Sequence, residues 1–166
     1  MVMPRLSRRR WLALLLAVAA APALAAEVDD EVQHILAAQV AAWNAGDAKA
    51  LAQDFARDGE MVNLLGTHFQ GKDDIERRHA QLFATLFKGS RLELLKSHLR
   101  SASHASVVVE TEHLLIGFKS LPADFPPVDA RDGLRTTLKY VFIREHEHWK
   151  VISARFTSAN GVALPN

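Results

Sequence analysis

The stretch that decides the fold of this chain is WNAGDAKALAQDFARDGEMVNLLGTHFQGKDDIERRH, residues 43–79. Asn44-Ala45-Gly46 ends a first helix, because its glycine suits the left-handed position that follows a helix C-terminus. Asp47 is a good N-cap for a second, short helix, which is expected to include Phe55 and to end at residues 57–59. The stretch therefore predicts two helices separated by a sharp break.

The rest of the stretch predicts a short strand, a turn and a longer helix. Residues 60–65 form the strand and residues 66–71 the turn region. Asp73-Asp74 open the helix, where its dipole favours negative charge, and Lys88-Gly89 close it. Helical spacing places one histidine among the apolar residues of a single face: Ile75, His79, Leu82, Phe83 and Leu86.

The sequence on either side completes an α+β pattern. Apolar residues recur at helical spacing from Glu27 to Trp43, which predicts the first helix. A long loop is expected at residues 119–132, because this segment contains three prolines. Strands rich in β-branched and aromatic residues are predicted at residues 91–100, 106–118, 134–145 and 149–158. We therefore expect helices first and then an antiparallel meander, which is an α+β domain.

Taken together, these motifs resemble the nuclear-transport-factor-2-like (SnoaL-like) superfamily, and most nearly its SgcJ/EcaC branch. The resemblance extends over residues 28–160 and rests on Trp43-Asn44-Ala45-Gly46-Asp47, Phe55, Asp58, Gly71, Ile75, His79 and the closing Trp149-Lys150-Val151-Ile152. It implies a cone-shaped fold, in which three N-terminal helices pack on a strongly curved antiparallel β-sheet around a hydrophobic pocket. It also implies a homodimer formed through the outer face of the sheet.

The resemblance implies several functions rather than one. Members include isomerases, dehydratases, polyketide cyclases, subunits of ring-hydroxylating dioxygenases and association domains, and a shared fold does not select among them. We expect a domain that binds a small, apolar molecule, with cofactor-free acid–base catalysis (isomerase, cyclase or dehydratase-like) as its enzymatic form. A non-catalytic association or oligomerisation module is the alternative. The SgcJ/EcaC name implies an oxidoreductase, although the sequence contains no nicotinamide or flavin motif.

The first 25 residues predict an export signal. Four arginines precede an apolar run from Trp11 to Ala21, and Ala23-Leu24-Ala25 offers the small-x-small cleavage pattern. The apolar run is shorter than the roughly 20 residues that a membrane-spanning helix needs. Residues 7–12 also resemble a twin-arginine signal, which leaves the export route open. We expect residues 26–166 to form a single periplasmic or secreted domain with no membrane association once the signal peptide is removed.

Charge and cysteine content exclude several classes of function. Four of the 20 Lys and Arg residues lie in residues 1–25, whereas none of the 19 Asp and Glu residues do, so the remaining chain has a net charge of about −3. This acidic balance argues against nucleic-acid binding. The chain contains no cysteine, which excludes disulfides, thiolate catalysis, iron–sulfur clusters and cysteine-ligated zinc.

His79 is the first candidate catalytic residue. Its helix face should turn toward the sheet and the pocket, where a neutral imidazole can act as a general base or orient a ligand. The alternative is a core histidine whose hydrogen bonds are satisfied by one backbone or side-chain group.

Two strand residues are candidates for a polarising group beside His79. Tyr140 aligns with Leu138 and Phe142, and a phenol in the pocket can donate to an enolate or carbonyl oxygen. Strand alternation places Arg155 on the same face as Trp149, where a buried arginine needs a partner or an anionic ligand. The alternative for Arg155 is a position at the rim, paired with a surface carboxylate.

Five further residues are candidates for contact with a ligand: Trp43, Phe55, Met61, Phe83 and His98. Core packing explains the four apolar ones equally well. The sequence does not decide which face of the strand at residues 106–118 points inward, because Glu110 and Glu112 share one side while His113 lies on the other.

No metal ion and no other cofactor is expected. Residues 145–148, Glu-His-Glu-His, have the composition of a metal site. They fall at a predicted hairpin turn before Trp149, however, and should be solvated there.

Overall fold

The computed structural model describes residues 30–119, 133–160 and 162–164. The predicted export signal and nearly all of the predicted long loop lie outside these residues. Within them, no helix is both long enough and apolar enough to cross a membrane.

The end of the first helix and the starts of the second and third lie where the sequence predicts, whereas the third ends at Ala84 rather than at the predicted Lys88-Gly89. The first helix covers residues 30–45, and Gly46 follows it with a φ of 66°, a left-handed conformation that glycine adopts without steric cost. Helix α2 (Ala48–Gln53) is capped by the carboxylate of Asp47, which accepts a hydrogen bond from the N–H of Ala50 at 2.9 Å. Helix α3 (Lys72–Ala84) carries Asp73 and Asp74 in its first turn.

The second predicted helix is shorter than expected, and Phe55 is not part of it. Helix α2 ends at Gln53, and strand β1 (Phe55–Val62) begins two residues later. The N–H of Val151 donates to the carbonyl oxygen of Asp54 at 2.9 Å, and Phe55 pairs with Val151 in the sheet. Long-range pairing thus overrides the local helical pattern.

The later strands are confirmed and form one sheet: β3 (Arg91–Ala102), β4 (Ser106–Ile116), β5 (Leu134–Glu145) and β6 (His148–Ala159). Two short strands, β2 (His68–Gln70) and β7 (Val162–Ala163), were not predicted. The strand order in the described chain is β2-β1-β6-β5-β4-β3, with β7 paired to β6.

The prediction of a wholly antiparallel sheet is wrong at one pair. Strands β1 and β6 run parallel, whereas the other described pairs are antiparallel. Helix α3 follows β1 and β2 in the chain, which agrees with the strand, turn and helix predicted for residues 60–89 and departs only from the general expectation of helices first. The α+β class itself is confirmed.

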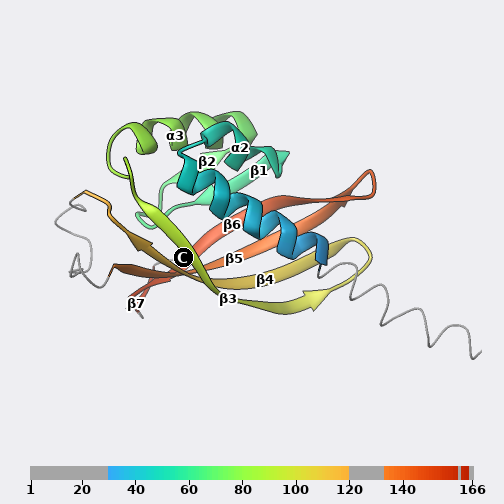
Figure 1. Ribbon diagram of the computed structural model, residues 1–166. Coiled ribbons are helices and arrows are strands. Elements are labelled where there is room, and N and C mark those ends of the chain that lie inside the picture. The colour runs from blue at the N-terminus through green and yellow to red at the C-terminus, as the bar shows by residue number, and fades with distance from the viewer. Residues whose placement is uncertain (1–29, 120–132, 161, 165–166) are drawn as a thin grey trace, which may run out of the picture.

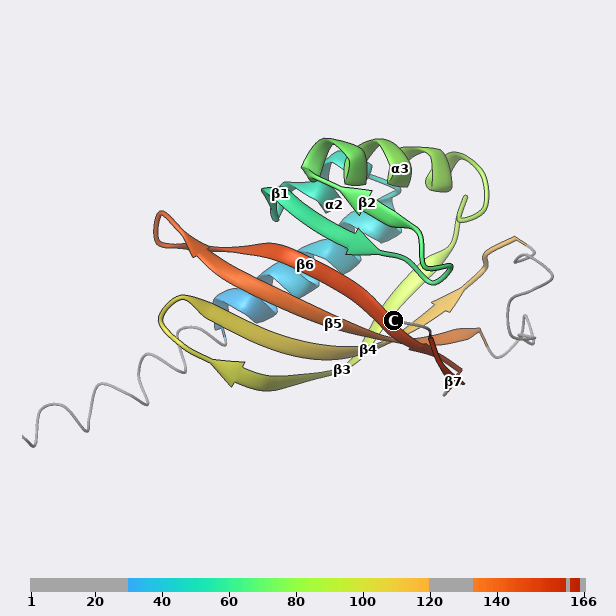
Figure 2. The ribbon, with the colours of Figure 1, turned by 180° about the vertical axis from the view of Figure 1, so that it is seen from behind.

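The helices cover one face of a curved sheet. The first helix lies across β3 to β6, while α2 and α3 lie beside β1 and β2 (Figure 1). From behind, β3 to β6 stand in front of the first helix with no described helix over them (Figure 2). The core fills the space between these layers, and its largest fully buried side chains include Trp149, Phe142, Leu36 and Ile75.

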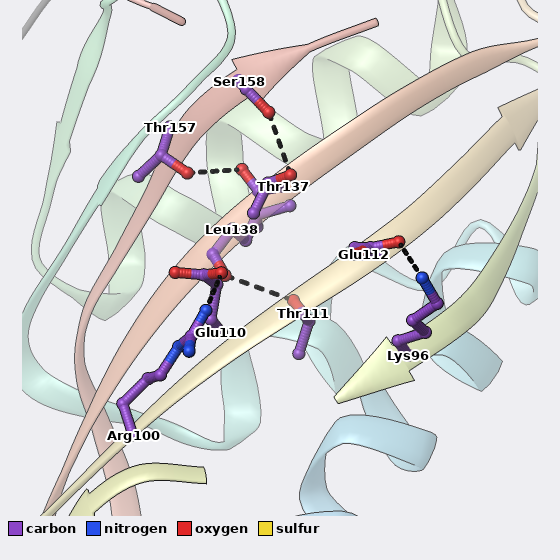
Figure 3. Close-up of polar contacts among 9 residues, drawn as sticks. All are labelled: Lys96, Arg100, Glu110, Thr111, Glu112, Thr137, Leu138, Thr157 and Ser158. Carbon is purple, nitrogen blue, oxygen red and sulfur yellow. Dashed lines mark hydrogen bonds and ion pairs between the residues drawn. The ribbon is translucent and has the colours of Figure 1, made fainter. Parts of the chain in front are cut away.

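Alternation along β4 settles which of its sides faces the core. Val107, Val109, Thr111, His113 and Leu115 are buried, so His113 points inward. Glu110 and Glu112 point to the outer face, where each lies beside a basic residue of β3 (Figure 3). Arg100 contacts Glu110 at 2.6 Å and Lys96 contacts Glu112 at 3.2 Å. The two glutamates are therefore not an acid–base pair in the core.

A bulge in β6 overturns the predicted position of Arg155. The pairing with β5 jumps from Phe142 opposite Val151 to Val141 opposite Ser153. Ile152 is therefore the extra residue, and it reverses the side to which the following residues point, up to a second extra residue at Thr157. Ala154 and Phe156 consequently turn inward, while Arg155 turns to the outer face opposite Lys139.

Candidate functional site

A small cavity lies between the helices and the inner face of the sheet. Its volume is about 50 Å³, enough for roughly three or four water molecules. Its described lining is mostly apolar and includes no carboxylate and no lysine or arginine: Gln39, Val40, Trp43, Leu51, Met61, Leu64, His79, Leu92, His113, Leu115, Thr136, Leu138, Tyr140 and Phe156. A site of this kind favours a neutral ligand.

His79 enters the cavity from α3 with a defined proton position. It is 2 % exposed, and its Nδ1 lies 2.8 Å from the carbonyl oxygen of Ile75. A carbonyl oxygen only accepts, so Nδ1 carries the proton and Nε2 holds a lone pair. Burial lowers the pKa of His79, and the hydrogen bond to Ile75 offsets this only in part. The ring is therefore neutral at neutral pH.

The Nε2 atom of His79 makes no hydrogen bond to any of the described residues. The rings of Trp43, Phe69 and Phe83 surround the imidazole at centroid distances of 6.3, 5.8 and 5.9 Å. Aromatic walls hold the imidazole in place but offer Nε2 no donor. The lone pair is thus available to a molecule in the cavity.

Trp43 forms part of the same wall and is itself fixed by hydrogen bonding. Its Nε1–H donates to Oγ of Ser90 at 3.1 Å. One residue further along, the Asn44 side chain donates to the carbonyl oxygen of Leu92 at 3.0 Å and accepts from the Leu92 N–H at 2.7 Å. These bonds join the end of the first helix to β3 and hold the indole against the cavity.

Tyr140 supplies a hydrogen-bond donor to the cavity from β5. Its hydroxyl lies 3.5 Å from Oε1 of Gln39, which is a long contact that a better acceptor can replace. Burial raises the pKa of Tyr140 well above its ordinary value, so the phenol keeps its proton. Tyr140 lies in line with buried Leu138 and Phe142, as predicted.

His113 is a cavity residue that was not among the predicted site residues. It is 3 % exposed, and its Nδ1 lies 3.4 Å from Oγ1 of Thr111. That hydroxyl also lies 3.4 Å from the carbonyl oxygen of Leu138, and when it donates to that oxygen it accepts from the Nδ1–H of His113. Burial lowers the pKa of His113 to about 4. The alternation of Val107, Val109 and Leu115 was the sequence signal for its inward orientation.

The structure brings together some of the predicted site residues and separates others. Trp43, Met61, His79 and Tyr140 line the cavity. Phe55 and Phe83 are buried in the core outside the described lining, and Phe83 packs edge-on against Trp43 at 5.1 Å.

His98 and Arg155 do not reach the cavity. His98 is exposed on β3, opposite Glu110 on the outer face. It comes after a bulge in β3, where the pairing with β4 jumps from Leu94 opposite His113 to Lys96 opposite Glu112. In both strands an extra residue turns the candidate side chain to the outer face. Strand alternation had placed Arg155 inward, whereas the sequence left the direction of His98 open.

The site has the components of acid–base chemistry but not of metal binding. An unprotonated Nε2 can take a proton, and a protonated phenol can stabilise a developing oxyanion. Among the described residues, no three His, Asp or Glu side chains are grouped to hold a metal ion. The Glu145–His148 segment forms a hairpin turn, with His146 and Glu147 exposed at its tip.

Residues 32–156 match the family described as SnoaL-like domain. The chain belongs to this family. No protein of curated function shows significant sequence similarity to it.

Solved structures with this fold resemble the SnoaL-like chain over most of its length. A cystatin-like protein from Caulobacter vibrioides shares 24 % identity with a TM-score of 0.70, covering 81 % of this chain and 92 % of that one. An NTF2-like protein from Novosphingobium aromaticivorans shares 19 % identity with a TM-score of 0.68, covering 89 % and 92 %. A proposed calcium/calmodulin-dependent protein kinase II association domain from Xanthomonas campestris shares 14 % identity with a TM-score of 0.59, covering 80 % and 88 %. These similarities establish the fold.

Proposed function

We propose that this SnoaL-like domain binds a small, neutral, largely apolar carbonyl compound and catalyses proton transfer on it without a cofactor. The observation that carries the proposal is the Nε2 lone pair of His79, which meets no described donor although the side chain is only 2 % exposed. No described side-chain nitrogen or oxygen is both fully buried and without a partner, so this lone pair is open to water or to a ligand in the cavity.

The proposed reaction moves one hydrogen within the substrate. His79 Nε2 removes a proton from the carbon next to the carbonyl, and the electron pair of that C–H bond shifts to the carbonyl oxygen. The Tyr140 hydroxyl donates a hydrogen bond to the resulting enolate. The imidazolium then returns the proton to the original carbon or to another carbon of the enolate. Return to another carbon gives an isomer of the substrate. Where the proton on Nε2 exchanges with solvent before it returns, the substrate carbon carries a solvent hydrogen, which is the exchange followed in D₂O.

The neutral resting state of both groups supports this assignment of roles. Burial keeps His79 unprotonated and Tyr140 protonated at neutral pH. The imidazolium exists only beside the enolate, whose charge stabilises it in the apolar cavity. His79 is thus the proposed base, and Tyr140 is the proposed oxyanion donor.

The experiment uses cyclopentanone as the probe and follows exchange of its α-hydrogens in D₂O by proton NMR. We expect the protein to accelerate exchange above the buffer rate and His79→Gln to abolish this acceleration. Glutamine keeps an acceptor at the same depth but is not a base. His98→Gln, an exposed histidine on β3, is the matched control and should retain the full rate. Equal rates for His79→Gln and the parent would overturn the proposal.

The cavity size limits the ligand in the described conformation. A space of about 50 Å³ holds only a few non-hydrogen atoms. Val40, Leu64, Leu92 and Phe156 are only half-buried where they border it. A ring-sized molecule therefore enters by displacing these side chains.

The non-catalytic association module is less well supported than the cavity function. A face that only associates should be broad and apolar, yet the outer face of the sheet carries the ion pairs of Lys96 with Glu112 and Arg100 with Glu110. We retain a homodimer through this face as a proposal, because half-buried Val108 and Val141 lie opposite each other there. Light scattering of the purified domain tests the dimer.

Three finer assignments are also proposals. The first is that the fold is a cone and that the chain belongs to the SgcJ/EcaC branch, whose name implies an oxidoreductase. The second is that the protein is exported to the periplasm or secreted. The third is that it binds neither nucleic acid nor a membrane. A chromophore bound to the purified protein would favour the oxidoreductase. Cell fractionation of the full chain tests export.

A further inference from the structure

His113 contacts the protein through the same ring nitrogen as His79, but it enters the cavity from the sheet rather than from α3. His79 belongs to α3, beside β1 and β2, whereas His113 belongs to β4 in the sheet below the first helix (Figure 1). Each ring uses Nδ1 for a bond to the protein: His79 to the Ile75 carbonyl, and His113 to the Thr111 hydroxyl. In each, Nε2 makes no hydrogen bond to the described residues.

The Thr111 hydroxyl lies 3.4 Å from both the carbonyl oxygen of Leu138 and Nδ1 of His113. In the arrangement in which the hydroxyl donates to Leu138, it accepts from Nδ1–H and leaves Nε2 of His113 as the acceptor. The chain Leu138–Thr111–His113 therefore ends in an acceptor at Nε2. The proposed function leaves this acceptor unused.

We propose that His113 is a second ligand-binding residue of the cavity, whose Nε2 accepts a hydrogen bond from a hydroxyl or N–H group of the bound molecule. This inference rests on the proposed function and narrows its substrate class. The molecule is a neutral carbonyl compound that also carries a hydrogen-bond donor. Anions are excluded, because two lone pairs face the cavity and no lysine or arginine is found in its described lining.

The burial and charge of His113 fit this role. It is 3 % exposed among Leu115, Leu138 and other apolar lining residues, and its pKa is lowered to about 4. It is thus an unprotonated acceptor at neutral pH and does not attract carboxylates. A buried acceptor discriminates strongly against molecules that lack the donor, because it is then left unpaired.

The first test needs no ligand. Long-range proton–nitrogen NMR of the histidine side chains reports which ring nitrogen is protonated. We expect the proton of His113 on Nδ1 and none on Nε2 at neutral pH. A proton on Nε2 of His113 would overturn the inference directly.

The second test compares phenol with anisole, which lacks the hydroxyl proton, and with benzoate, which is an anion. We expect phenol to bind the parent protein about tenfold more tightly than anisole, benzoate not to bind, and the His113 Nε2 resonance to move on phenol addition. His113→Leu should lose about tenfold in phenol affinity and keep its anisole affinity. His113→Gln, which offers an amide oxygen, should recover most of the phenol affinity. His98→Gln is the control.

The outcomes separate this inference from the proposed function. If His113→Leu binds phenol as the parent does while His79→Gln abolishes cyclopentanone exchange, the inference is wrong and the proposed function stands. If exchange is never accelerated but the phenol preference depends on His113, the acid–base function is wrong and the binding role of His113 stands. If neither phenol nor anisole binds near its solubility limit, the inference is wrong, and the proposed function is decided by cyclopentanone exchange alone.

Discussion

The Nδ1 atom of His79 lies 2.8 Å from the carbonyl oxygen of Ile75, one turn earlier in α3. This single bond fixes the imidazole tautomer and places the free lone pair at the cavity. The same carbonyl already accepts a backbone bond within the helix, so the packing of α3 does not depend on the imidazole. The stability of α3 therefore does not explain why a histidine occupies position 79.

His79→Leu should therefore leave the protein about as stable as the parent. Leucine fills the space between Trp43 and Phe83, and no buried polar group loses its only partner. We expect a change in the free energy of unfolding within about 1 kcal/mol, measured by urea denaturation. A loss of several kcal/mol would show that the imidazole is a structural element of the core.

His113 should make stability depend on pH between about 6.5 and 4. The folded state keeps His113 neutral down to its pKa of about 4, whereas the unfolded chain takes up the proton near pH 6.5. The unfolded state thus binds more protons in this window, and stability falls as the pH falls. The contribution of His113 is on the order of 3 kcal/mol across the window.

The variant His113→Leu isolates this effect. Its stability should fall less steeply from pH 6.5 to 4 than that of the parent, as measured by urea denaturation at a series of pH values. Parallel curves for the parent and His113→Leu would contradict the burial of a neutral imidazole.

Phe156→Ala should enlarge the cavity and improve the entry of ring-sized molecules. Phe156 is half-buried and borders the cavity from β6. We expect phenol to bind at least several-fold more tightly, and the free energy of unfolding to fall by about 2 kcal/mol, less than for a fully buried phenylalanine. Calorimetry measures the first and denaturation the second. Unchanged phenol affinity would mean that this side of the cavity does not limit entry.

Arg155→Gln should leave binding and exchange in the cavity unchanged. The β6 bulge at Ile152 turns Arg155 to the outer face, opposite Lys139. Phenol affinity and the cyclopentanone exchange rate should therefore stay within twofold of the parent values, the ordinary scatter of an outer-face substitution. A tenfold loss of either would place the guanidinium inside the cavity and contradict the register.

Glu147→Gly should stabilise the protein slightly. Glu147 has a φ of 73° at the tip of the β5–β6 hairpin, a conformation that strains residues with a side chain and suits glycine. We expect a gain of about 0.5–1 kcal/mol in the free energy of unfolding. Glu147→Ala keeps the strain and is the matched control. An equal effect of both substitutions would trace the gain to the lost carboxylate instead.

Local patterns were enough to predict the helices and one side of the cavity. The spacing of Ile75, His79 and Phe83 identified the buried face of α3, and the three are buried. The Asp47 cap and the Gly46 break were confirmed because short-range geometry decides them. Tyr140 was placed correctly because β5 pairs with β4 without a bulge beside it.

The errors came from interactions between distant parts of the chain. The bulge at Ile152 depends on the match between β5 and β6, and a two-residue alternation contains no sign of it. The parallel pairing of β1 with β6 drew Phe55 out of the predicted helix. His113 was missed for a different reason, since its strand alternates regularly and only the choice of inner face was left open.

The most direct test of the central claim is the rate of α-hydrogen exchange of cyclopentanone in D₂O at neutral pH, with the parent protein and His79→Gln side by side. We expect exchange well above the buffer rate with the parent and exchange at the buffer rate with the variant. Identical rates for the two proteins would contradict the role of His79 as the base of this cavity.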